Sequence, residues 1–196
     1  MQLGHFDNRS RNVLTTGFES SRNTEQFFRA RWTINPFWIT ELNALTGKRI
    51  RKSELFTNRD FSINFQKIIP KITYVPNPQW EATLAYELQK AKNGLPDALA
   101  SATFHDLKAS LQYNKTQKTV LRSELSFVQI ALTGSTNPTL ELALLEGLQD
   151  GQNFLWTLSL DRQLANNLQL GIQYEGRKTG ERAIVHLGSM MVRATF

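Results

Sequence analysis

Apolar and polar residues alternate along most of this chain, and this period of two restricts its fold more than any other feature. Residues 80–88 and 105–113, for example, carry an apolar or aromatic side chain at almost every second position. Successive residues of a β-strand point to opposite faces, so each run indicates a strand whose two faces meet different environments. The repetition of such runs predicts an all-β protein.

The alternation recurs often enough to predict about ten strands. Further clear runs occupy residues 28–34, 38–44, 121–127, 154–160, 168–174 and 189–196. A weaker run covers 12–20, and we expect residues 1–11 to lack regular structure. Within 60–75 the apolar residues change parity between Phe65 and Ile68, which predicts a β-bulge near Pro70.

The connections between these runs alternate in length. Short ones lie at 35–36, 76–78, 114–117 and 164–167, and mostly longer ones at 47–59, 91–101, 133–152 and 177–182. In an up-and-down sheet, alternate connections lie at the same end, so one end has short turns and the other has long loops. Outer-membrane barrels show this asymmetry. The pattern predicts one domain over 1–196, an antiparallel up-and-down transmembrane β-barrel of about ten strands or the C-terminal part of a larger one.

Composition excludes several other classes. The chain contains no run of about 18 to 20 apolar residues, which a transmembrane helix would need, and it has no cysteine for disulfides or thiolate metal sites. The formal net charge is +6, but Lys and Arg are scattered singly, which argues against a nucleic-acid partner. The first residues lack the features of a secretory signal, so the sequence is either a cytoplasmic protein or the C-terminal piece of a longer one.

The aromatic residues predict which face meets lipid. Several lie within about three or four positions of the short turns, at one depth, as expected for a membrane-interface girdle. These are Trp32, Trp38, Trp80, Tyr113 and Phe196. Phe154 and Tyr174 lie nearer the other end and are candidates for an opposite girdle. The last strand resembles that of bacterial outer-membrane barrels, and this resemblance implies that Val192, Ala194 and Phe196 form a signal for the barrel-insertion machinery.

The opposite face of the strands carries charges of both signs, and in a barrel these side chains would line the lumen. The expected lumen charges are Arg29, Arg31, Glu41, Glu81, Lys108, Arg122, Glu124, Glu175 and Arg193. Alternation alone does not say which face is outside. A soluble lipocalin-like barrel, with its apolar residues inside and an apolar small molecule bound there, is the alternative.

The sequence gives little support for catalysis or metal binding. His5, His105 and His186 share no metal-ligand spacing, and a Ser–His–acid site drawn from Ser101 or Ser189 and Asp106 rests on residue type alone. We therefore expect no catalytic, metal or cofactor site. In the longest loop, residues 140–147 predict a short helix ending at Gly147, which would fold into the barrel or cap its rim. The basic run 48–52 would contact lipopolysaccharide phosphates or form a solvated loop.

The C-terminal third carries a more specific resemblance. Residues 144–151, 153–156, 164–170, 174–178 and 192–196 form a connected series, and 58–61 and 70–74 add to it. Together they resemble the C-terminal region of large, poorly characterised outer-membrane and cell-surface proteins of the Bacteroidota. This resemblance implies an outer-membrane location, contact with outer-membrane lipid and lipopolysaccharide, and an N-terminal domain of the same gene product. It brings no catalytic residues, so the expected role is structural, anchoring or transport.

Overall fold

The computed structural model describes the whole chain except residues 15–16, 96–98, 116–117, 135–136, 166 and 195–196. The described part forms one sheet of ten antiparallel strands, each hydrogen-bonded to its neighbours in sequence. This confirms the predicted all-β, up-and-down fold. The strands are β1 (Gln2–Leu14), β2 (Gly17–Asn35), β3 (Trp38–Ser53), β4 (Phe61–Asn77), β5 (Trp80–Asn93), β6 (Ala100–Lys115), β7 (Thr119–Gly134), β8 (Gly151–Ala165), β9 (Leu168–Thr179) and β10 (Val185–Ala194).

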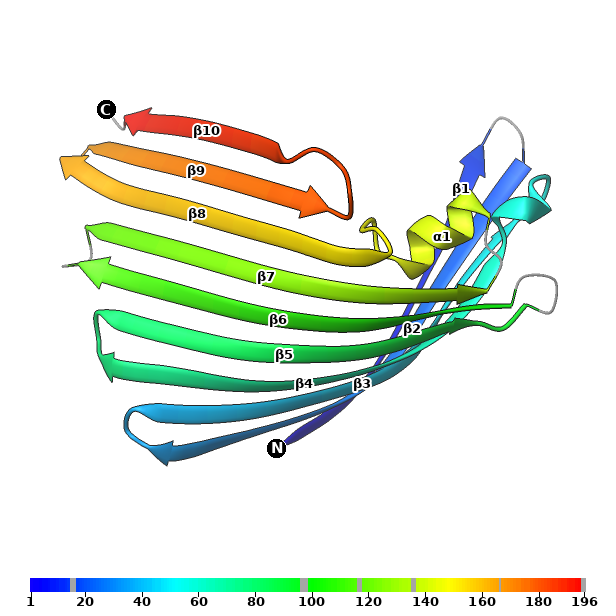
Figure 1. Ribbon diagram of the computed structural model, residues 1–196, viewed down its shortest axis with the longest axis horizontal. Coiled ribbons are helices and arrows are strands. Elements are labelled where there is room, and N and C mark those ends of the chain that lie inside the picture. Colours follow the sequence, from blue (N-terminus) through cyan, green and yellow to red (C-terminus); the bar gives the residue numbers. More distant parts are fainter. Residues whose placement is uncertain (15–16, 96–98, 116–117, 135–136, 166, 195–196) are drawn as a thin grey trace.

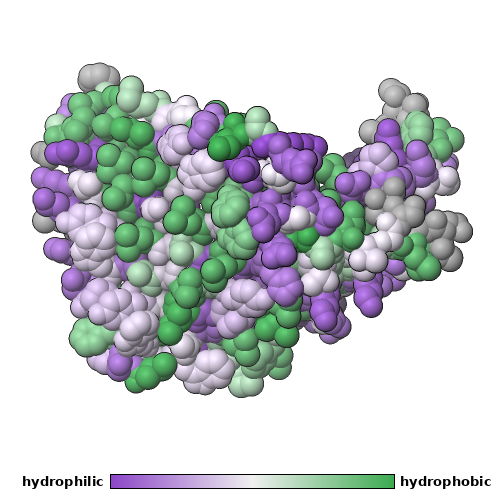
Figure 2. Space-filling view, in the orientation of Figure 1, coloured by the Kyte–Doolittle hydropathy of each residue, from purple (hydrophilic) through white to green (hydrophobic). Residues whose placement is uncertain are grey.

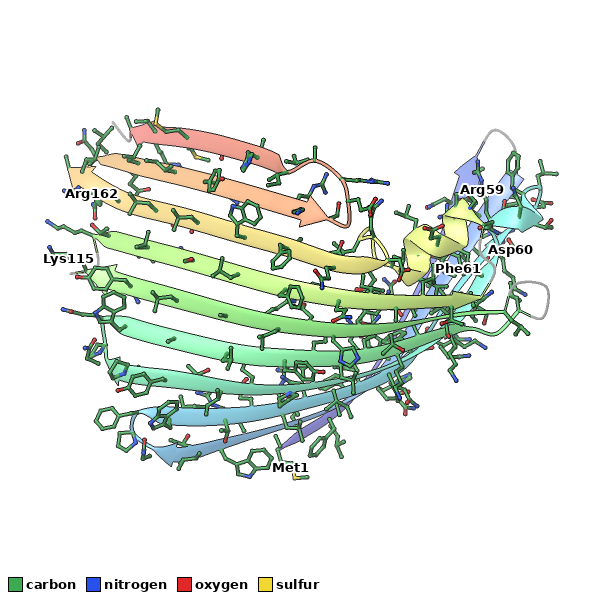
Figure 3. The ribbon with its side chains drawn as sticks, viewed as in Figure 1. Met1, Arg59, Asp60, Phe61, Lys115 and Arg162 are labelled. Carbon is green, nitrogen blue, oxygen red and sulfur yellow. The ribbon has the colours of Figure 1, made fainter. Side chains whose placement is uncertain are left out.

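The sheet is curved and twisted, with the short turns at one end and the longer connections at the other (Figure 1). Lys115 and Arg162 lie at the short-turn end, whereas Arg59, Asp60 and Phe61 lie at the opposite end beside the helix (Figure 3). Among the described residues, β1 pairs with β2 and β10 with β9, and the two edge strands do not pair with each other. The strand order is therefore that of an up-and-down barrel, but the sheet is open.

One helix, α1 (Pro138–Leu144), packs against the sheet at the long-loop end, and we call the face that it covers the inner face. Asn137 caps the helix by accepting a hydrogen bond from the backbone N–H of Leu140, and Gly147 follows with a left-handed φ of 84°. Sequence predicts a helix here, but the predicted bounds of 140–147 are wrong: the helix begins two residues earlier and ends at Leu144, three residues before Gly147. A single 3₁₀ turn, η1 (Thr57–Arg59), lies between β3 and β4.

The hydrophobic core lies between α1 and the inner face of β4 to β7. Leu140, Leu144 and Leu145 are almost fully buried there. They pack with inner-face residues of four strands, namely Ile63, Phe65, Ala91, Ala100, Ala102, Phe104, Val128 and Ile130. The longest loop thus folds onto the inner face of the sheet.

The predicted bulge near Pro70 is wrong. The register of β4 against β3 is continuous from Arg51–Phe61 to Trp38–Tyr74, and the one irregularity with β5 lies beyond Tyr74. The apolar residues change parity for a different reason. Phe61, Ile63 and Phe65 face inward, beneath or beside α1, whereas Ile68, Ile72 and Tyr74 face outward. The apolar residues of β4 change face because the inward ones pack near α1 at one end of the strand, whereas those towards the short turn lie on the exposed outer face.

Several other predicted boundaries need correction. Residues 12–14 and 17–20 are the paired ends of β1 and β2 rather than parts of one strand. Gln2–Leu14 form β1 rather than lacking structure, because backbone pairing with β2 compensates for a weak apolar pattern. Residues 47–53, expected in a loop, continue β3 because they pair with β2 and β4. Within the described residues, neither helix has the length and hydrophobicity needed to cross a membrane.

The packing of α1 makes a testable prediction. Leu144→Ala removes a side chain that is 1% exposed, and we expect it to weaken docking of α1 by about 2 to 5 kcal/mol. Hydrogen–deuterium exchange of the α1 backbone amides measures this loss. Leu142→Ala is the matched control, because Leu142 lies in the same helix but is 65% exposed. Equal effects of the two substitutions would contradict the packing described.

Candidate functional site

The outer face of the sheet carries a continuous apolar belt on the short-turn side. The outward positions of β5 from Trp80 to Leu88 are apolar or aromatic, and Ile68, Leu107 and Leu125 extend the belt on neighbouring strands. Large side chains in this belt are exposed, including Leu84 at 48% and Leu125 at 58%. Hydrophobic side chains spread over the short-turn side of the face shown in Figure 2, and hydrophilic ones gather where the strands continue towards α1. An exposed apolar area of this extent indicates contact with another apolar phase or partner.

The predicted aromatic residues lie in this belt close to the short turns. Trp80 packs against Tyr113 across β5 and β6 with ring centroids 4.3 Å apart, and Trp38 packs against Tyr74 at 4.5 Å. Trp32 points outward one row further from the turns, opposite Thr40. These residues therefore share one face and one end of the sheet. Phe196 lies outside the described residues. That the group forms a membrane-interface girdle stays a prediction.

A second aromatic group lies further from the short turns on the outer face. Phe127 and Phe154 pack with ring centroids 4.7 Å apart. Tyr174 hydrogen-bonds to His186 Nδ1 at 2.7 Å, and Tyr86 makes the same bond to His105 at 2.5 Å. Rings with an apolar body and a polar edge suit a boundary between lipid and water.

The inner face has the opposite character. The nine residues predicted as lumen charges all lie on it, because the strand register gives them the same parity as the residues under α1. Glu41 lies between Arg31, at 3.5 Å, and Lys71, at 3.3 Å, on the neighbouring strands. Lys108 contacts Asp106 at 3.1 Å, and Arg122 contacts Asp161 at 2.9 Å. The polar face is thus a surface of paired charges. Whether it lines a closed lumen stays a prediction.

The remaining predicted charges have neighbours of several kinds on this face. Arg29 donates to Asn43 Oδ1 at 2.8 Å, and Glu175 accepts from Gln173 at 2.6 Å. Glu81 and Glu124 point inward with Ser110 near both in the register. Arg193 lines a trough of about 620 Å³ along β7 to β10, whose walls are both polar and apolar.

Glu146 joins α1 to the sheet, and sequence reasoning does not single it out. Its carboxylate lies 2.9 Å from Arg49 Nη1 on β3 and 3.9 Å from Lys67 Nζ on β4, and it accepts a hydrogen bond from Gln89 on β5 at 3.2 Å. Lys67 also contacts Glu87 at 2.8 Å. Partial burial would raise the pKa of Glu146, but Lys67, Gln89 and Arg49 together hold that pKa below its usual range.

The backbone at Glu146 belongs to the C-terminal turn of α1. Its φ is 53°, the left-handed conformation common just after a helix C-cap. The N–H of Gly147 donates to the carbonyl of Leu142 at 3.3 Å and closes this turn.

The sequence does contain one indication of the Arg49 side of the contact with Glu146. In the basic run, Arg49 and Arg51 alternate with Lys48, Ile50 and Lys52, and this period of two indicates a strand with both arginines on one face. In the structure that face is the inner one.

The hypothetical Ser–His–acid site does not form. Asp106 points inward and accepts a hydrogen bond from Ser126 at 2.6 Å, whereas His105 points outward to Tyr86. His186 points outward as well, and Ser189 points inward. Among the described residues, no three His, Asp or Glu side chains come together as metal ligands.

Comparison with models of known families and with curated proteins finds no match to this chain. The resemblance to Bacteroidota surface proteins is therefore still a prediction from the motifs that carry it. The geometry of the two faces is what bears on function.

The Glu146 contacts predict a specific effect of neutralising this residue. Glu146→Gln should weaken docking of α1 by about 1 to 2 kcal/mol, because Arg49 and Lys67 lose their shared carboxylate. Hydrogen–deuterium exchange of α1 measures the change. Glu141→Gln, an exposed position in the same helix, should change docking by less than about 0.5 kcal/mol. A larger effect at Glu141 than at Glu146 would count against this assignment.

The same contacts predict how α1 docking depends on pH. The pKa of Glu146 is lower in the folded chain than its usual value of 4.5, so its contribution is complete above that value and is lost as the pH falls through the lowered pKa. A spin label on Leu142→Cys should become more mobile in that acidic range. The Glu146→Gln background should show a smaller pH dependence, and an unchanged one would refute the assignment.

Proposed function

We propose that this chain is a barrel-forming sheet of the bacterial outer membrane that acts mainly as an anchor. The observation that supports this most is the direction of its polarity: on the short-turn side, apolar residues cover the outer face and charged residues cover the inner face. A soluble lipocalin-like barrel needs the reverse. An apolar ligand on the inner face would meet Glu41, Lys71 and Lys108, so the soluble alternative gains no support.

The dimensions of the belt agree with this proposal. A transmembrane strand needs about 9 to 11 residues. The apolar outward run of β5 extends from 80 to 88 and that of β6 from 105 to 113, with aromatic residues towards both limits. Beyond these limits the outward residues are polar, namely Lys90 and Lys92 on β5 and Ser101 and Thr103 on β6, as expected once the strands leave the membrane.

The position of α1 favours anchoring over an open pore. The helix and its buried leucines occupy the inner face at the long-loop end, and Glu146 holds them there. Towards the short turns the inner face carries ion pairs such as Arg31–Glu41, whereas an open pore would be lined by polar side chains facing water. Transport remains a role that this arrangement would allow only with movement of α1.

Insertion would require the barrel-insertion machinery. Val192 and Ala194 lie on the outer face of β10, where they could form part of the signal for this machinery.

Membrane location is tested directly by fractionation. Expressed with a secretion signal, the chain should stay with the outer membrane after a carbonate wash and should migrate differently in detergent gels before and after heating. Recovery as a soluble monomer without detergent would exclude the proposal.

A charge scan of the two faces is a sharper test. Ala109 points outward between Leu84 and Leu125, near the middle of the belt. Ala109→Arg should therefore oppose insertion into lipid vesicles by about 2 to 4 kcal/mol. Urea titration of the heat-modifiable, folded form measures the cost.

The matched control lies one residue further along the same strand. Ser110 points inward beside Glu124, so Ser110→Arg would gain an opposite charge there and should insert nearly as well as the parent chain. Greater loss with Ser110→Arg than with Ala109→Arg would invert the proposed faces and exclude the membrane proposal.

A further inference from the structure

Lysines from two strands gather on the outer face immediately beyond the apolar belt. Lys48 on β3 and Lys92 on β5 lie on either side of Asn64 on β4, in one row of the register. At about 4.8 Å between neighbouring strands, their Cα atoms are about 10 Å apart. Lys90 lies in the next row beside Gln66, and the row after that is the apolar pair Ile68 and Leu88. We call Lys48, Lys90 and Lys92 with Asn64 and Gln66 the lysine patch.

The charges of this patch are available for a ligand. Lys48, Lys90 and Lys92 are exposed, and in the part of the chain that the structure describes they take part in none of the ion pairs. The arginines of the same basic run are committed elsewhere. Arg49 pairs with Glu146, and Arg51 pairs with Glu19 at 2.8 Å, both on the inner face.

Acidic residues are distributed very unequally between the two faces. In the described strands β2 to β10 every carboxylate points inward. These residues are Glu19, Glu25, Glu41, Glu81, Glu87, Asp106, Glu124, Asp161 and Glu175. Asp7 on β1 points outward, and Arg9 and Arg22 hold it at 2.8 and 3.0 Å. Water would tolerate carboxylates on either face, whereas a surface of negative charge would repel those that point outward.

From these observations we infer that the lysine patch binds the phosphate groups of anionic membrane lipids in the leaflet at the long-loop end. The inference rests on the proposed membrane location and adds a site to it. The acyl chains of such a lipid would lie on Ile68 and Leu88, and its phosphates would lie one or two rows higher, among the lysine ammonium groups. Asn64 and Gln66 supply amide donors between them, and Thr103 adds a hydroxyl group on β6.

The absence of cysteine from the sequence allows a clean test with a single label. Ser101→Cys, beside Lys92 on the outer face, carries a fluorophore, and the full chain is folded into phosphatidylcholine vesicles. The vesicles contain a small fraction of quencher-bearing lipid, either phosphatidylglycerol or phosphatidylcholine with the same labelled acyl chain. We expect the anionic quencher to be enriched about fivefold at this label, the factor that one lysine near an anionic surface supplies.

Substitution of the patch should remove this enrichment. In Lys48→Gln/Lys90→Gln/Lys92→Gln the ratio of the two quenching efficiencies should fall to about one. The matched control is Lys115→Gln/Lys118→Gln/Arg162→Gln, which removes the same charge at the short-turn end and should leave the ratio at the Ser101→Cys label unchanged. A label at Gln129→Cys, on the outer face of β7 away from the lysines, should show little enrichment in any variant.

Heat-modifiable migration, recorded on the same samples, separates the two proposals. A chain that inserts but shows equal quenching by both lipids, or keeps its enrichment without the three lysines, overturns the lipid site and leaves the membrane proposal standing. A parent chain that does not insert overturns both.

Discussion

The structure depends on one constraint of the β-strand, which is that every residue must face one of only two sides. In this sheet the apolar side changes along the length of the strands. Near the short turns the outward residues are apolar and the inward ones charged, and near α1 the arrangement is reversed. Strand β4 shows both states without interruption, with Phe65 inward and Ile68 outward. A change of surroundings explains this without any shift in the register of the strand at these residues.

The inner face can carry so many charges because they pair across neighbouring strands. Glu41 is shared by Arg31 and Lys71, and Lys67 lies between Glu87 and Glu146. Partly exposed pairs such as Arg31–Glu41 contribute little stability singly. Those of Glu146 act instead by positioning the loop after β7, because Glu146 in that loop contacts Arg49 on β3, Lys67 on β4 and Gln89 on β5. The same loop supplies the leucines that give the sheet its compact core.

Sequence alone predicts an up-and-down sheet of about ten strands, and period two correctly predicts which of the described girdle and charged residues share a face. It fails where the strand pattern is weak or where its environment changes. Strand β1 is missed because backbone pairing, rather than an apolar stripe, defines it. The change of apolar face in β4 is misread as a bulge because it results from the packing of α1 on the inner face, and the strand pattern does not reveal that tertiary contact. Glu146 is missed because its partners lie on three strands far away in sequence.

The apolar belt also constrains the two edges of the sheet. It continues outward on β10 through Met190 and Val192, which are 71% and 56% exposed, and reaches Leu3 on β1. In water an open edge invites pairing with other chains. In lipid the cost is greater, because unpaired backbone N–H and C=O groups find no water there. If the belt lies in the membrane, β1 and β10 must therefore be paired at that depth, either with each other or with further strands. The anchor proposed for this chain requires that completed ladder as much as it requires the belt.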